Sequence, residues 1–395
     1  MRITRRGFTL GAASLAASTT LARPALAQSE PIRVGWLAAL TGPSSAPAIG
    51  FDRGVHYATD AINAAGGING RQIELVVRDT QGDPTKAVNA AQEMISRARV
   101  HAIWGPTNSG ESLATTPIMA RAGVPNVHPC FVDALIDTKR YPNAFRMAPS
   151  NTQIDNAVGD YGVKILGKKK FAVIGDTTGY GTTTVKSSSA AFEARDSEVV
   201  YAGTIEQTQP DVTSDMLRMK NAGAEAIAIW TVSPGLISRI LNTRANLDWD
   251  VPVIGHPAMG SGEVGRLVDK PENWSNAYIL GFRNTSYGDD GKLPDHVQAF
   301  VDKIKSEIDL DDTTLWWILD GVDSINIIAD AVRETGTTDP KDIIGYWNAQ
   351  ADYPGLFASY TFSPDQHNGL SPEDLVMSEA NSQKYGAYKL APGYE

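Results

Sequence analysis

The sequence predicts an α/β protein with two open sheets of mostly parallel strands. Short apolar runs alternate with helical patterns from residue 32 to residue 128, and the alternation restarts from residue 171 to residue 255. This order is typical of strand–helix–strand units, whose strands are parallel and whose helices cover both faces of the sheet. Extended segments near residues 145–150, 279–285 and 353–361 follow or separate the two series. We therefore expect two lobes joined by three connections.

The first series starts with a strand at 32–40, which ends in a Thr-Gly-Pro turn, and a helix from about 49 to 64. The glycines of segment 66–70 are a strong stop signal after that helix. Asp83 followed by Pro84 is the pattern of an N-cap and a first helical residue, so the next helix is expected to reach about Arg97. The other strands expected in this lobe are 73–77, 100–104 and 124–128.

The second series follows an extended crossover predicted at 143–147. Its expected helices are 153–166, one after Gly181, 211–222 and 236–245, and its expected strands are 171–175, 199–203, 226–230 and 251–255. Segment 277–282 is again extended and precedes helical patterns at 295–308, 314–333 and 341–347. Few strands remain for these last helices, so we expect them to complete the first lobe.

The N-terminal segment 1–27 has the pattern of a twin-arginine secretory signal. Arg5 and Arg6 precede a weakly apolar run that ends at Leu21, and Ala-Leu-Ala at 25–27 is a small-residue cleavage site. The run is too short and too poor in large apolar side chains to span a membrane. We therefore expect the twin-arginine machinery to export the chain to the periplasm.

Composition limits the classes of partner. Removing residues 1–27 takes away four arginines and no acidic residue, so the formal net charge of −10 becomes −14. Such an acidic chain is not expected to bind nucleic acid or an anionic membrane. Cys130 is the only cysteine, which excludes a disulfide within the chain, and the six histidines lack metal-ligand spacing. No metal and no cofactor are predicted.

The segment from 102 to 118 is the strongest candidate for a binding loop. An apolar strand ends at Gly105, small polar residues follow, and a helical pattern starts near Ser109. The first turn of a helix offers unpaired N–H groups and a positive dipole end, which together with a hydroxyl suit a carboxylate. The alternative is that Asn108 or Ser109 only caps the helix.

Other polar and aromatic residues follow the predicted strands. Open α/β sheets bind ligands at the carboxyl ends of their strands, and aromatic side chains opposite a hydrogen-bonding wall suit a small acid with an apolar body. The predicted ligand-binding residues are Thr107, Asn108, Ser109, Pro129, Cys130, Phe131, Tyr180, Trp230, Thr231, Ser233 and His256.

Two motifs are typical of other functions, nucleotide binding and thiol catalysis, but the residues around them do not fit those functions. Residues 260–265 match G-x-G-x-x-G, yet four residues separate the first glycine from the preceding strand, so nucleotide binding is not expected. His128 and Cys130 could suggest a thiol nucleophile beside a base, but Pro129 turns their side chains apart. A buried, inert cysteine is the favoured interpretation, and no catalytic residue is predicted.

Five segments together resemble the leucine/isoleucine/valine-binding family of type I periplasmic solute-binding proteins. They are LTGP (40–43), NAAGGINGR (63–71), DTQGDPTKAV (79–88), WGPTNSG (104–110) and TGYG (178–181), and the similarity covers the whole chain after the signal. The resemblance implies two Rossmann-like lobes joined by three crossover strands, which close over a ligand in the cleft. It also implies no enzymatic activity and delivery of the solute to an ABC permease in the inner membrane.

On this basis we expect residues 28–147 and 283–357 to form lobe I, and residues 148–282 and 358–395 to form lobe II. The predicted function is to bind a branched-chain or other hydrophobic amino acid, or a related small carboxylate, as a monomer. The alternative of another class is a periplasmic α/β enzyme or a ligand-sensing partner of a receptor.

The resemblance leaves the ligand open. Amino-acid binders of the family place a hydroxyl near Val132 and an acidic residue near Pro257 to hold the ammonium group, and neither type is present at these positions. Asp133 and Glu263 are candidate substitutes. An aromatic acid of the benzoate or cinnamate type is the alternative ligand.

Overall fold

The computed structural model describes residues 30–311 and 313–394. The predicted twin-arginine signal, residues 1–27, lies outside the described residues. In the part of the chain that the structure describes, no helix is both long enough and apolar enough to cross a membrane.

The first sheet has five parallel strands in the order β2-β1-β3-β4-β5. They are β1 (Ile32–Ala38), β2 (Ile73–Asp79), β3 (Ala102–Trp104), β4 (Asn126–His128) and β5 (Ala144–Arg146). Residues 34–38 of β1 are buried on both faces, as expected for a central strand of a parallel sheet. Its helices are α1 (Ser45–Ala64), α2 (Pro84–Glu93) and α3 (Ser109–Ala122), with α10 (Leu315–Thr335) and α11 (Pro340–Asn348) added from late in the chain.

The start of α2 confirms the predicted cap. The side chain of Asp83 accepts hydrogen bonds from the backbone N–H groups of Thr85 and Lys86, and Pro84 is the first helical residue. The helix continues as a π-helical turn at Met94–Ala98, so it ends close to the predicted position.

The second sheet has six strands in the order β14-β10-β9-β8-β6-β7. They are β6 (Lys170–Asp176), β7 (Glu198–Ile205), β8 (Ala226–Trp230), β9 (Val253–Gly255), β10 (Ala277–Phe282) and β14 (Leu375–Glu379). All neighbours are parallel except β10 and β14, which are antiparallel. The helices of this part are α4 (Asn151–Asp160), α5 (Gly179–Glu193), α6 (Thr213–Asn221), α7 (Pro234–Asn246) and α8 (Gly262–Leu267).

Two segments predicted as extended connections are strands of the sheets. Residues 144–146 pair with β4, and residues 277–282 pair with β9 and β14, because their backbones continue the ladders of their sheets. The chain passes between the sheets after β5, again after β10, and a third time after the hairpin of β12 (Tyr353–Pro354) and β13 (Ser359–Tyr360). The two sheets and three connections agree with the predicted architecture.

Along the second passage lie β11 (Ser286–Tyr287) and α9 (Asp295–Ile304). The strand β11 forms a short parallel pair with β15 (Tyr388–Lys389), which follows β14. The strand β14 and the pair β11–β15 were not expected from the sequence. Their strands are short or carry mixed side chains, so periodicity gives little signal for them.

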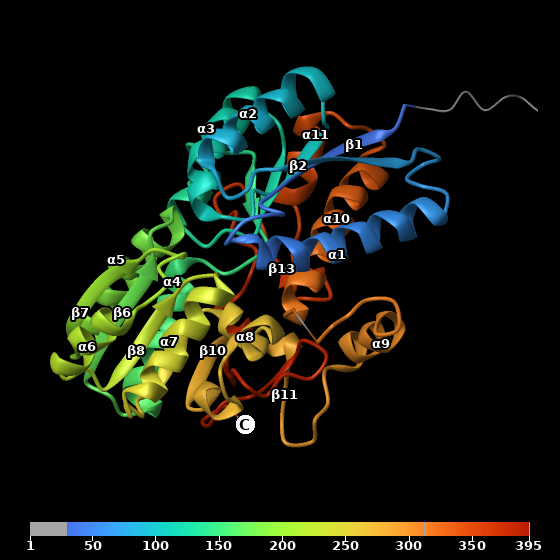
Figure 1. Cartoon of the computed structure of the whole chain (residues 1–395). Helices are drawn as coiled ribbons and strands as arrows, with labels where there is room; N and C mark the ends of the chain where they lie inside the picture. Colours follow the sequence, from blue (N-terminus) through green and yellow to red (C-terminus); the bar gives the residue numbers. More distant parts are fainter. Residues whose placement is uncertain (1–29, 312, 395) are drawn as a thin grey trace, which may run out of the picture. The chain divides into compact units, whose positions relative to one another are not determined.

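The helices α1 and α10 pack side by side (Figure 1), and glycines lie at their crossing. A Cβ atom built on Gly54 of α1 would lie 2.0 Å from the carbonyl oxygen of Ile318 in α10. A Cβ atom on Gly321 of α10 would lie 2.5 Å from the carbonyl oxygen of Phe51 in α1. The two helix backbones are therefore close enough that only glycine fits at this crossing. The crossing fixes where the first turns of both helices lie relative to the first sheet.

Candidate ligand-binding site

A cavity lies where strands of both sheets reach their carboxyl ends. Its volume is about 360 Å³ including its open side. The lining residues are Pro47, Phe51, Thr107, Asn108, Ser109, Pro129, Cys130, Phe131, Tyr180, Val232, His256, Trp316 and Trp317.

The structure brings most of the predicted ligand-binding residues to this one cavity. From the first sheet come the loop after β3 and the loop after β4, and from the second sheet come the first turn of α5 and the residue after β9. The predicted residues that line the cavity are Thr107, Asn108, Ser109, Pro129, Cys130, Phe131, Tyr180 and His256. Their contact with a ligand stays a prediction.

Three predicted residues do not line the cavity. Trp230 is fully buried in β8. The hydroxyl of Thr231 donates to Asp176 Oδ2 at 2.7 Å, and the hydroxyl of Ser233 accepts from the backbone N–H of Leu236 as the cap of α7. Hydrogen-bonding partners within the second lobe thus account for both hydroxyls, and the residue of this turn that lines the cavity is Val232.

The polar wall is the N-terminus of α3. Asn108 is the N-cap, and its Oδ1 accepts from the backbone N–H of Gly110 at 2.9 Å. Asn108 therefore caps the helix, as the alternative interpretation of this loop predicted. Ser109 is the first residue of the helix, is 3% exposed and lines the cavity. A helix terminus and a hydroxyl that face the same cavity favour an anionic or carbonyl oxygen there.

The apolar wall is a cluster of aromatic rings around Phe131. Its ring centroid lies 5.9 Å from that of Tyr180, 5.7 Å from that of His256 and 6.2 Å from that of Trp316. Tyr180 lies in α5 and His256 follows β9, both next to the second sheet, whereas Trp316 belongs to α10, so Phe131 contacts rings on both sides. The buried indole N–H of Trp316 has no hydrogen-bond partner among the described residues, which leaves a donor in this wall.

Among the described residues that line the cavity, none has an acidic side chain. The two substitutes considered for ammonium binding, Asp133 and Glu263, lie outside it, and Asp133 Oδ2 accepts from the hydroxyl of Thr152 at 3.0 Å. Burial lowers the pKa of the His256 imidazole to about 3, so this ring is neutral at physiological pH. Its Nδ1 accepts from the backbone N–H of Ala258. The described part of the lining is therefore uncharged apart from the helix dipole.

Cys130 is held as a thiol. Its Sγ donates to the carbonyl oxygen of Pro106 at 3.1 Å and accepts from the hydroxyl of Ser112 at 3.2 Å. Burial raises the pKa of the Cys130 thiol to about 12. The Nδ1 of His128 accepts from the backbone N–H of Cys130, whereas the thiol donates to Pro106. This arrangement does not supply the thiolate and base that nucleophilic catalysis needs.

Several lining residues were missed by the sequence analysis. Pro47 and Phe51 lie in the first two turns of α1, and Trp316 and Trp317 lie in the first turn of α10. Adjacent tryptophans at the start of a long apolar helix are a signal that could have been used. Their partners could not, because helix periodicity identifies a buried face without identifying what covers it.

The G-x-G-x-x-G match is explained by packing. A Cβ atom on Gly260 would lie 2.6 Å from the ring of Tyr388, and one on Gly265 would lie 2.5 Å from the ring of Trp274. These glycines make room for side chains of the second lobe. Within residues 30–311 and 313–394, no group of three or more His, Cys, Asp or Glu side chains could hold a metal ion.

Comparisons with known proteins agree with this architecture. A model of the periplasmic binding protein family matches residues 31–383. Leu/Ile/Val-binding protein homolog 3 of Brucella melitensis is 28% identical over 213 residues, and the match spans 53% of this chain and 58% of that protein. Leu/Ile/Val-binding protein homolog 2 of Brucella abortus is 25% identical over 360 residues, which cover 90% of this chain and 92% of that one.

Among solved structures, a type 1 periplasmic binding protein from Bordetella pertussis Tohama I has 26% identity and a TM-score of 0.81. That comparison covers 92% of this chain and 100% of the other. The family match extends over nearly all the described residues, and the fold has the two sheets and three connections expected of a type I member. The chain therefore belongs to the periplasmic binding protein family, in the branch that includes the Leu/Ile/Val-binding proteins.

Proposed function

We propose that this chain is the periplasmic solute-binding component of an ABC importer. It binds a small carboxylate in the cavity described above and delivers it to a permease in the inner membrane. It acts as a monomer, reaches the periplasm through the twin-arginine machinery, and catalyses no reaction. The observation that carries the proposal is the cavity itself, because its walls come from the strand ends of both sheets. A ligand held there would contact both lobes at once, as hinge closure requires.

The first candidate ligand is a hydrophobic amino acid. The relatives of the chain are Leu/Ile/Val-binding proteins by name. The N-terminus of α3 with Ser109 suits the α-carboxylate, and the ring of Phe131 suits an apolar side chain. This candidate needs an acceptor for the ammonium group as well.

The second candidate is an aromatic acid of the benzoate or cinnamate type. It is favoured by the absence of Asp and Glu from the described residues that line the cavity. An ammonium group buried without an anionic partner is costly by several kcal/mol. An aromatic acid has no such group, and its ring would meet Phe131 and Trp316.

Matched pairs of solutes distinguish the two candidates by calorimetry. Each pair differs only in the α-ammonium group: leucine against 4-methylpentanoate, and phenylalanine against 3-phenylpropanoate. If the ligand is an aromatic acid, 3-phenylpropanoate binds at least about 100-fold more tightly than phenylalanine, a difference of about 2.7 kcal/mol. Tighter binding of leucine or phenylalanine selects the amino acid. If no amino acid or organic acid binds in a broad screen, the proposal fails.

Two serine variants test the location. Ser109→Ala should weaken binding of whichever solute is selected, because the hydroxyl in the polar wall is lost. Ser233→Ala is the control, since Ser233 also lies at a helix N-terminus but does not line the cavity. Equal affinities of the two variants would place the ligand elsewhere.

A substitution of Cys130 separates binding from catalysis. A Cys130→Ser variant that keeps its affinity for solute is expected of a binding protein. Turnover of a bound solute by the wild type, abolished in this variant, would instead show the enzyme that was considered as the alternative.

A further inference from the structure

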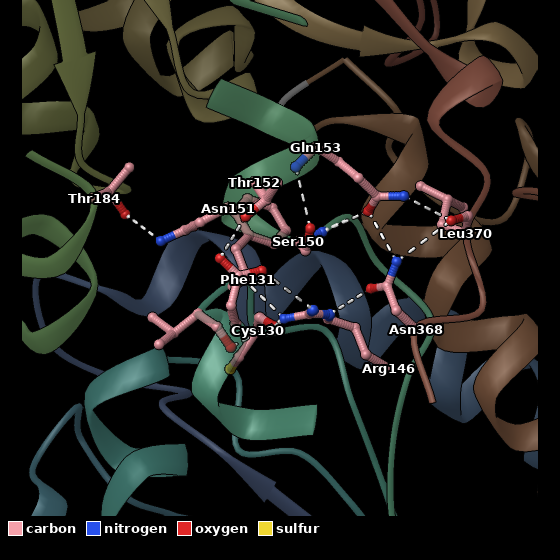
Figure 2. Close-up of polar contacts among 12 residues, drawn as sticks. Cys130, Phe131, Arg146, Ser150, Asn151, Thr152, Gln153, Thr184, Asn368 and Leu370 are labelled. Atoms are coloured by element: carbon pink, nitrogen blue, oxygen red, sulfur yellow. Dashed lines mark hydrogen bonds and ion pairs between the residues drawn. The ribbon is translucent and has the colours of Figure 1, made fainter. Parts of the chain in front are cut away.

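Arg146, the last residue of β5, is fully buried. It lies beside the loop that carries Cys130 and Phe131 (Figure 2). Its Nη1 donates to the carbonyl oxygens of three consecutive residues, at 3.1 Å for Cys130, 2.9 Å for Phe131 and 3.0 Å for Val132. Two of these three residues line the cavity. A single guanidinium group therefore holds the backbone of the loop that carries the central ring of the aromatic wall.

The other edge of the guanidinium faces a connection between the sheets. Arg146 Nε donates to Asn368 Oδ1 at 2.6 Å, and the backbone of Arg146 pairs with residues 367 and 369. Asn368 lies on the passage that leads from β13 to β14. Its Nδ2 donates to Gln153 Oε1 at 2.9 Å, and Gln153 belongs to the capping box at the start of α4. The first passage, from β5 into α4, thus meets the third passage at this point.

The same wall residue is also bonded directly to α4. The carbonyl oxygen of Phe131 accepts from the backbone N–H of Asn151 at 2.7 Å, in addition to the bond from Arg146. The side chain of Asn151 donates to Thr184 of α5 (Figure 2), one turn after Tyr180, whose ring packs against that of Phe131. A movement of α4 relative to the first sheet would therefore displace the backbone of Phe131.

We propose that Arg146 is a positioning residue that couples the Phe131 wall of the cavity to two of the connections between the lobes. This inference rests on the proposed function, since it makes solute binding and the conformation of the connections interdependent. Arg146 need not touch the solute. It acts by keeping the loop 130–132, the segment 367–370 and the first turn of α4 in one arrangement.

Arginine is suited to this role because its planar group presents five donors in a fixed fork. Burial lowers the pKa of Arg146 only to about 10, so the group remains charged at physiological pH. A charged donor strengthens its hydrogen bonds to carbonyl oxygens. Lysine has no fork and cannot reach the loop and Asn368 together.

Two variants each remove part of the hydrogen-bond network formed by Arg146 and Asn368, and a third variant is the control. Arg146→Lys removes the fork, whereas Asn368→Asp keeps an acceptor for Arg146 and removes the donor to Gln153. The control is Arg244→Lys. Arg244 is also a buried arginine, 3% exposed, and donates to several backbone carbonyl oxygens, but it does not line or adjoin the cavity.

The first measurement is the affinity for leucine and for 3-phenylpropanoate, beside the free energy of unfolding. Arg146→Lys and Asn368→Asp should each weaken binding of the solute that the wild type binds by about tenfold. Arg244→Lys should lose stability but keep its affinity within about twofold. An affinity loss in Arg244→Lys equal to that in Arg146→Lys, or unchanged affinity in both network variants, would overturn the inference.

The second measurement needs no solute and therefore separates this inference from the proposed function. The exchange rate of the Asn151 amide proton reports on its bond to Phe131. Arg146→Lys should speed this exchange about tenfold relative to amides of β8, whereas Arg244→Lys should not. If the wild type binds neither probe, the function proposal is at fault, and unchanged Asn151 exchange in Arg146→Lys still overturns the coupling.

Discussion

Substitution of Gly54 by alanine tests how the crossing of α1 and α10 shapes the cavity. The added Cβ atom would lie 2.0 Å from the carbonyl oxygen of Ile318 and 3.0 Å from the backbone nitrogen of Val322. An ordinary contact is about 3.5 Å, so the two helices would have to part by roughly 1.5 Å. Both contacts are with backbone atoms, so a side-chain rotation cannot relieve them.

The expected loss of stability follows from two opposing effects. Overpacking of this kind costs about 3 kcal/mol at the upper end of its range. The higher helix propensity of alanine returns about 1 kcal/mol. The free energy of unfolding of Gly54→Ala should therefore fall by about 2 kcal/mol, measured by urea denaturation. The affinity for solute should fall too, because Phe51 and Trp316 occupy the first turns of the parted helices and line the cavity.

Gly345→Ala is the matched control. Gly345 also lies inside a helix, α11, but a Cβ atom there would meet nothing within 4 Å. This variant should gain about 1 kcal/mol from helix propensity and bind solute as the wild type does. If Gly54→Ala were as stable as Gly345→Ala and bound solute equally well, the helix crossing would not control the cavity.

Three further predictions concern charge and aromatic contacts. Burial raises the pKa of Asp155 to about 7, so its contribution to stability is present below pH 4 and is lost as the pH rises through 7. The free energy of unfolding of Asp155→Asn, measured by urea denaturation, should therefore rise relative to that of the wild type by about 3 kcal/mol between pH 5 and pH 8. Equal pH profiles of the two proteins would contradict this. Because His256 is neutral, solute affinity measured by calorimetry should be constant from pH 5.5 to 8, and a transition near pH 6.5 would refute it. Trp316→Leu should weaken solute binding about tenfold through loss of the ring and its N–H donor, whereas Trp230→Phe, outside the cavity, should leave the calorimetric affinity unchanged.

Much of the fold could be predicted because its signals are local. The strand β8 was predicted at its observed bounds, since 226–230 is an apolar run set between turn residues. The start of α2 was predicted from Asp83 and Pro84 alone. The strand β14 was not, because its place is decided by antiparallel pairing with β10, nearly a hundred residues earlier in the chain. Which residues belong to each lobe at the boundaries stays a prediction.

The site also combines residues that local signals identify with residues whose place depends on the tertiary structure. Residues 107–109 were identified because a polar turn between a strand and a helix is recognisable within ten residues. The turn at 230–233 was also recognised, but the residue of this turn that lines the cavity is Val232, which was not selected. Which residue of a turn faces a cavity depends on local hydrogen bonds, such as that of Thr231 with Asp176, and these are set by the tertiary structure.

The difference between the two walls explains why such a sequence reveals its family more readily than its ligand. The polar wall is encoded by one contiguous loop and a helix N-terminus, and it would recognise the carboxylate of many different solutes. The apolar wall, which would select the rest of the solute, combines Phe131 with Trp316, residues almost two hundred positions apart. Their contact depends on the packing of α10 on α1 and on the loop held by Arg146. Solute selectivity should therefore respond to substitutions in that packing, such as Gly54→Ala and Arg146→Lys, even though neither residue lines the cavity.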